Sequence, residues 1–178
     1  MRSRFLLVPV AVLAFSQPEP ALALQYQNLE EVQQRLYPGQ KLTPADFKLT
    51  PEQFTRLKSE YKVPALRPAF KAWRAEDGGW LFLDQVFGLS DIVTYLVAVS
   101  PQGKVLGIEI LVCAEGFCDI FTPEWRAQLG RQVHGKWQPR DVAPILSGST
   151  LSSIHIIEGV KKILAIHARF LPPSTAAR

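Results

Sequence analysis

The chain has 178 residues, and 47% of them are apolar, which is enough for one domain with a substantial core. Its formal net charge of +4 comes from 20 Lys and Arg against 16 Asp and Glu, without a dense basic block. This balance gives no support for a nucleic-acid partner. The three histidines and two cysteines lack the spacing of metal ligands, so we predict no metal site.

The N-terminus has the features of a secretory signal peptide. Arg2 and Arg4 precede an apolar run at 5–15, which is too short to cross a bilayer as a helix. The Ala-Leu-Ala sequence at 21–23 fits a cleavage site. We therefore expect residues 1–23 to be removed and the remaining chain to be periplasmic or otherwise exported, and soluble. An uncleaved membrane anchor is the alternative.

Two amphipathic helices are predicted in the first part of the mature chain. The first begins after Asn28, which is a favoured N-cap residue. The second begins after Thr50, which can form a capping box with Gln53. We therefore predict that residues 24–76 are an N-terminal helical part of the same domain. The proline-rich segment 63–79 is expected to end in a turn.

Three β-strands are predicted next, at about 80–87, 91–100 and 104–113. Their short connections indicate an antiparallel meander, and the fold class that follows is α+β, with this sheet packed by helices. The alternate apolar residues of the third strand are expected to share one core-facing side, namely Leu106, Ile108, Ile110 and Val112.

The C-terminal part is predicted to be helical. A short helix is expected after Thr122, and a long one from about 151 to 169 carries a wide apolar stripe. Lys161 and Lys162 in this helix are expected to be solvated charges. Residues 172–178 are expected to be a disordered tail.

Cys113 and Cys118 are close together in the sequence CAEGFC. In an exported protein such a pair is expected to form a local disulfide, with two unreactive thiols or a functional dithiol as alternatives. The spacer differs from that of C-x-x-C, so a thiol–disulfide oxidoreductase is only a third hypothesis for the function.

The stretch PILSGSTLSS at 144–153 is rich in Ser, Thr and Gly and leads directly into the long helix. A helix N-terminus has unpaired N–H groups and the positive end of the helix dipole, so the stretch is a candidate phosphate site. The simpler interpretation is an N-cap with a tight turn, because the same residue types are favoured there. The stretch is neither a Walker motif nor a G-x-S-x-G elbow.

From Gly79 to Leu171 the chain resembles the FMN-binding domain family. This family includes the flavin-carrying subunits of the sodium-pumping quinone reductase and the Rnf complex, as well as small exported proteins. The similar segments are, in order, GKVLGIEIL, AEGFCDI, PEWRAQLG, ILSGSTLSS and EGVKKIL. In the family, the Thr of an SGAT motif can carry FMN through a phosphoester that a flavin transferase makes from FAD. The resemblance implies that residues 77–171 are an FMN-binding core with Thr150 as the phosphate acceptor.

The resemblance also implies which other residues lie at the cofactor. These are Ser147, Gly148, Ser149, Leu151, Ser152, Ser153, Glu115, Gly116 and Trp125. Two of them have simpler interpretations, because Trp125 can be a packing residue and Glu115 a solvated loop carboxylate. His155 would add positive charge near the phosphate, or else pack or face solvent.

The implied function is electron transfer through FMN, with the flavin supplying the chemistry. The implied partners are a flavin transferase and a membrane or periplasmic redox protein, and no substrate-specific catalytic group is predicted. The alternative is an accessory module of a membrane redox complex that binds FMN non-covalently or not at all. Two departures motivate it, since the family often has Asp where this chain has Pro144, and Ala where it has Ser149.

Overall fold

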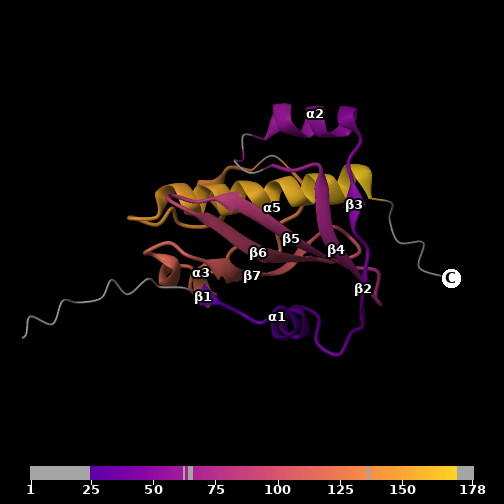
Figure 1. Cartoon of the computed structure of the whole chain (residues 1–178), viewed down its shortest axis with the longest axis horizontal. Helices are drawn as coiled ribbons and strands as arrows, with labels where there is room; N and C mark the ends of the chain where they lie inside the picture. The colour runs from indigo at the N-terminus through magenta and orange to yellow at the C-terminus, as the bar shows by residue number, and fades with distance from the viewer. Residues whose placement is uncertain (1–24, 62, 64–65, 136, 172–178) are drawn as a thin grey trace, which may run out of the picture.

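An antiparallel sheet lies at the centre of the molecule (Figure 1). The computed structural model describes residues 25–171 except 62, 64–65 and 136, so the predicted signal peptide and C-terminal tail lie outside the described residues. The strands are β1 (Gln25–Tyr26), β2 (Leu42–Pro44), β3 (Phe47–Lys48), β4 (Ala69–Ala75), β5 (Trp80–Phe87), β6 (Ile92–Val99) and β7 (Val105–Cys113). The helices are α1 (Leu29–Leu36), α2 (Pro51–Glu60), α3 (Pro123–Ala127), α4 (Pro139–Val142) and α5 (Thr150–Phe170), with a short 3-10 helix, η1 (Cys118–Ile120).

The strand order is β1-β7-β6-β5-β4-β2, and β3 also pairs with β4. All the pairings are antiparallel, so the α+β prediction is confirmed. Helix α5 lies along one face of the sheet and α1 along the other (Figure 1). Each face has its own apolar core, the larger one beneath α5 and the smaller one beneath α1.

The predicted helix starts are confirmed. Asn28 Oδ1 accepts a hydrogen bond from the N–H of Glu30 at 2.8 Å, and Thr50 and Gln53 form the expected capping box. Thr122 Oγ1 accepts from the N–H of Trp125 at 3.2 Å. These caps satisfy N–H groups that have no acceptor within the helix.

Strand β4 lies in the proline-rich segment that was expected to end in a turn, so that prediction was incomplete. Phe70 and Ala72 point into the larger core, while Trp73 and Ala75 point into the smaller one. Because β4 is buried on both faces, its sequence lacks the alternation that marks a half-buried strand. The part expected to be helical therefore also supplies strands β1 to β4 to the sheet.

The three-strand meander is confirmed as β5, β6 and β7, but the predicted alternation in β7 is partly wrong. Ile108 and Ile110 face the larger core, whereas Leu106 is 48% exposed and Val112 packs against the smaller core. The pairing with β6 shifts register at both ends of β7. Each bulge inserts one residue and moves the following side chains to the other face.

Lys162 is completely buried, so the prediction that it is solvated was wrong. Its Nζ lies 2.7 Å from Asp84 Oδ2 and 2.9 Å from Asp84 Oδ1. The hydroxyl of Tyr95 donates to Asp84 Oδ2 at 2.6 Å. Burial, and secondarily the nearby Asp84, raise the pKa of Tyr95 well above its usual value, so this hydroxyl remains a donor.

Gly159 makes room for this buried group, because a Cβ there would collide with the hydroxyl of Tyr95. Lys161 lies nearer the surface, where its Nζ is 3.9 Å from Glu158 Oε1 and 5.4 Å from the ring centre of Trp137. Adjacent lysines on α5 therefore differ in burial and in the strength of their ion pairs. None of the helices within the described residues has the length and hydropathy needed to cross a bilayer.

Cys113 and Cys118 form the predicted disulfide. It joins the end of β7 to η1 and closes the loop that carries Glu115 and Gly116.

Replacing both cysteines with serine is expected to lower the free energy of unfolding by about 2 kcal/mol, because the closed loop is short. Urea denaturation measures this. An unchanged free energy would contradict a stabilising bridge, and a loss above about 4 kcal/mol would show that the disulfide does more than close a short loop.

Candidate functional site

Helix α5 begins without a side-chain cap, unlike α1, α2 and α3. Ser149 occupies the N-cap position, but its side chain makes no capping hydrogen bond. Its Oγ is buried and has no hydrogen-bond partner among the described residues. The first N–H groups of this 21-residue helix therefore remain without a side-chain acceptor, at the positive end of the helix dipole.

The exposed residues of the loop make this helix start reachable. Gly148 is exposed and has a φ of 85°, in the left-handed region that favours glycine. Thr150 is exposed, and its hydroxyl donates to the carbonyl oxygen of Leu146 at 3.3 Å. The hydroxyl of Ser153, in contrast, is buried and donates to the carbonyl oxygen of Ser149 at 2.8 Å. Of these two hydroxyls, that of Thr150 is the one open to solvent.

Trp125 is a packing residue, as the simpler interpretation has it. It is only 3% exposed, and its ring centre lies 5.2 Å from that of Phe121. Its indole N–H donates to the carbonyl oxygen of Pro144 at 2.9 Å. Trp125 therefore holds the start of the 144–149 loop against α3.

Glu115 is buried, so the simpler interpretation of it as a solvated loop carboxylate was wrong. The hydroxyl of Ser152 donates to Glu115 Oε2 at 2.6 Å. Glu115 Oε1 accepts from the N–H groups of Leu89 and of Ser90, the latter at 2.9 Å. The carboxylate thus joins the β5–β6 turn to the first turn of α5 and is occupied by these internal contacts. Gly116, next to it, is exposed.

Two further contacts tighten the same junction. A Cβ at Gly88 would collide with the carboxylate of Glu115, so only glycine fits there without a shift. His155 is half-buried, and its Nδ1 lies 2.6 Å from the carbonyl oxygen of Phe87. The imidazole is therefore held against the end of β5.

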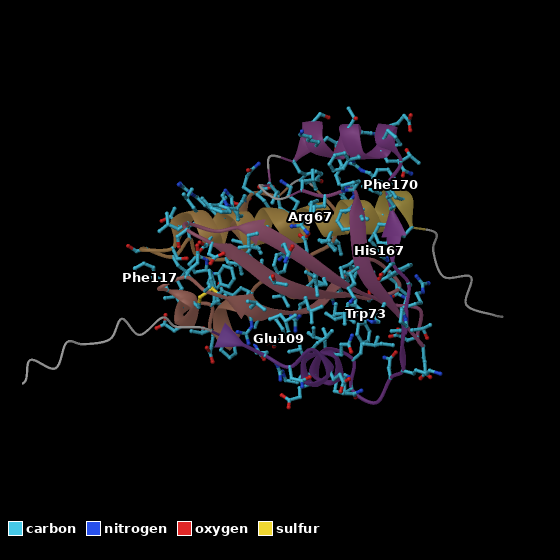
Figure 2. The ribbon with its side chains drawn as sticks, in the orientation of Figure 1. Arg67, Trp73, Glu109, Phe117, His167 and Phe170 are labelled. Carbon is cyan, nitrogen blue, oxygen red and sulfur yellow. A yellow bond between two sulfur atoms is a disulfide. The ribbon has the colours of Figure 1, made fainter. Side chains whose placement is uncertain are left out.

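Exposed apolar side chains surround the start of α5, and the sequence analysis identified only one of them, Leu151. They are 43% to 52% exposed and comprise Phe87, Leu89, Phe117 and Leu151, which we call the apolar rim. The ring of Phe117 lies 3.9 Å from where a Cβ of Gly148 would be. Phe117 lies at the same end of the molecule as the disulfide (Figure 2). The sequence signal for it was an aromatic residue inside the CAEGFC loop.

Removing the hydroxyl of Ser152 tests how much the contacts of Glu115 with α5 and with the β5–β6 turn stabilise the fold. Ser152→Ala is expected to lower the free energy of unfolding by about 2 kcal/mol, because a buried carboxylate loses one charge-assisted hydrogen bond. Thermal and urea denaturation measure this. Ser147→Ala, which removes an exposed hydroxyl of the same loop, is the control and should change it by less than about 0.5 kcal/mol. Equal effects of the two substitutions would show that the hydrogen bond between Ser152 and Glu115 does not stabilise the fold.

Comparison with protein-family models gives no match, and comparison with curated proteins gives none either. Within the described residues, no group of three or more His, Cys, Asp or Glu is arranged to hold a metal ion. The fold and the site define an α+β domain with an uncapped long helix, a reachable threonine hydroxyl at its first residue and an apolar rim.

Proposed function

We propose that this protein is an exported electron-transfer domain that carries FMN as a phosphoester on Thr150. The observation that carries the proposal is the uncapped start of α5. Ser149 is the residue that would normally cap it, yet its hydroxyl makes no such bond. This weakens the simpler interpretation of the SGSTLSS stretch and favours an anion at the helix N-terminus.

The chemistry of the attachment fits Thr150. In the transfer, Thr150 Oγ forms a bond to the FMN phosphorus of FAD, the bond from that phosphorus to AMP breaks, and the hydroxyl proton is lost. The resulting phosphodiester keeps one negative charge, which suits the positive end of the helix dipole. An exposed hydroxyl is also what a separate transferase needs to reach.

The apolar rim supports the same proposal. A flavin ring system is flat and has an apolar dimethylbenzene end, and exposed aromatic or aliphatic side chains nearby suit the binding of such a group. The Glu115 junction gives these side chains a fixed support, because it connects the segments that carry Leu89 and Leu151. When bound, FMN would supply one- or two-electron chemistry, and the protein would supply attachment and surroundings.

The second candidate function is a module that binds FMN non-covalently or lacks it. Pro144 favours this candidate, because the FMN-binding domain family that the chain resembles often has Asp at that position. Asp141, the nearest acidic residue, does not replace it, since its carboxylate accepts from the N–H of Gln138 at 2.9 Å and caps α4.

Production of the protein together with a flavin transferase separates the two candidates. The proposal predicts flavin fluorescence that remains on the polypeptide after denaturing electrophoresis. Loss of the fluorescence under denaturing conditions, combined with saturable quenching of added FMN by the native protein, would indicate the non-covalent module. If Pro144→Asp then restored attachment, the transferase would be shown to need an acid there.

A further inference from the structure

The outer edge of β7 is unpaired over its central residues. Strand β1 covers β7 only at Val112 and Cys113, and the N–H of Gln27 continues to the carbonyl oxygen of Leu111 at 2.9 Å. At the other end, the N–H of Arg131 donates to the carbonyl oxygen of Val105 at 2.9 Å. Among the hydrogen bonds of the described residues, none pairs the outer side of the backbone at 106–109.

The direction of these backbone groups follows from the pairing. Alternate residues of an antiparallel strand present their N–H and C=O groups to the same side. The carbonyl group of Ile110 points outward, because it accepts a hydrogen bond from Gln27 Nε2 at 2.7 Å. Ile108, two residues earlier, therefore also presents its N–H and C=O groups outward, whereas Gly107 and Glu109 lie opposite Ala98 and Leu96 and face β6. Unpaired groups of this kind are a template for another extended chain.

A hollow of about 440 Å³ lies along this edge, between β7 and α3. Figure 1 shows β1 and α3 beside β7, and Figure 2 shows Glu109 close to α1. Leu106, next to the bulge in β7, lines the hollow and is 48% exposed. Gly107 also lines the hollow, and a Cβ at this position would lie 2.8 Å from the side chain of Leu36. The unpaired residues span about 13 Å, the length of four residues in extended conformation.

The charges at the hollow are positive. Glu109 is neutralised by Arg126 at 3.1 Å and by Arg35 at 3.6 Å. Lys104 and Arg131 also line the hollow, are exposed, and have no carboxylate partner among the ion pairs of the described residues. Arg131 has a φ of 72°, a left-handed conformation that brings its N–H to Val105.

We propose that the outer edge of β7 binds an extended acidic segment of a partner protein by strand addition. Its backbone would pair with that of Ile108, an apolar side chain would contact Leu106, and its carboxylates would face Lys104 and Arg131. Backbone pairing supplies the affinity and the side chains select the sequence. This interface does not depend on flavin attachment.

The test uses the full chain and a fluorescein-labelled peptide of sequence Glu-Val-Glu-Val-Glu-Val. Fluorescence anisotropy should show saturable binding, and NMR spectra should show the amide signal of Ile108 among those that move most. A peptide with N-methyl groups on every residue should bind at least about tenfold more weakly, because neither of its edges can donate a backbone hydrogen bond. Equal binding by the methylated peptide would overturn strand addition.

Charge variants locate the peptide on the molecule. Lys104→Glu should weaken binding about tenfold at low salt, whereas Lys58→Glu, the same change on exposed α2, should leave it unchanged. Arg131→Gly should weaken binding without lowering the melting temperature, because glycine adopts this φ without strain. No saturable binding up to about 1 mM peptide, or equal effects of the Lys104 and Lys58 variants, would overturn the proposal.

Discussion

Replacing Lys162 with methionine is expected to lower the free energy of unfolding by about 3–5 kcal/mol, one of the two largest effects we predict. The change leaves Asp84 buried, with the hydroxyl of Tyr95 as its remaining side-chain partner. A buried carboxylate without its cation is strongly unfavourable, and methionine fills only the volume of the lysine stem. Urea denaturation of the two proteins measures the difference.

Two controls test whether the charge pair is the cause. Lys161→Met removes the neighbouring lysine, which is less buried, and should cost less than about 1 kcal/mol. The double variant Asp84→Asn with Lys162→Met removes both charges and keeps an acceptor for Tyr95, so it should recover much of the loss. If Lys161→Met and Lys162→Met cost the same, Lys162 is not a buried ion-paired residue.

Thr150→Val is expected to abolish covalent flavin in protein produced with a flavin transferase. Valine keeps the shape of threonine but lacks the hydroxyl that would form the phosphoester. The fold should be retained, because the hydroxyl makes one exposed hydrogen bond, to the carbonyl oxygen of Leu146. Flavin fluorescence after denaturing electrophoresis measures attachment, and circular dichroism checks the fold.

Two matched variants make this result specific. Thr150→Ser keeps a hydroxyl and should retain some attachment. Ser147→Ala removes another exposed hydroxyl of the same loop and should retain most of it, because Ser147 does not form the ester. Attachment that persisted in Thr150→Val would move the acceptor to a different residue. Attachment lost equally in Ser147→Ala and Thr150→Val would indicate that the loop conformation, and not the Thr150 hydroxyl, is required.

Much of the fold could be predicted because its signals are local. Asn28, Thr50 and Thr122 mark helix starts by their own hydrogen bonds, and these bonds involve residues close by in the sequence. The disulfide between Cys113 and Cys118 is similarly local. Strand β4 was missed because burial on both faces removed the alternation on which the prediction relied.

The candidate site was predicted less completely because its contacts connect distant parts of the chain. Glu115 bonds to Ser152 and to the backbone of Leu89, and neither contact can be inferred from the sequence of the Glu115 loop. Lys162 meets Asp84 from another element in the same way. A lone carboxylate or lysine usually faces solvent, so its burial becomes evident only when its partner is found.

The peptide that carries Thr150 gives the most direct test of the proposed function. Trypsin should release residues 141–161 from the denatured protein, because Arg140 precedes the peptide and Lys161 ends it. For protein exported by its native host, we predict that the mass of this peptide is increased by one FMN less one water and that fragmentation places the addition on Thr150. An unmodified peptide, from protein that also fails to bind added FMN, would contradict the flavin proposal.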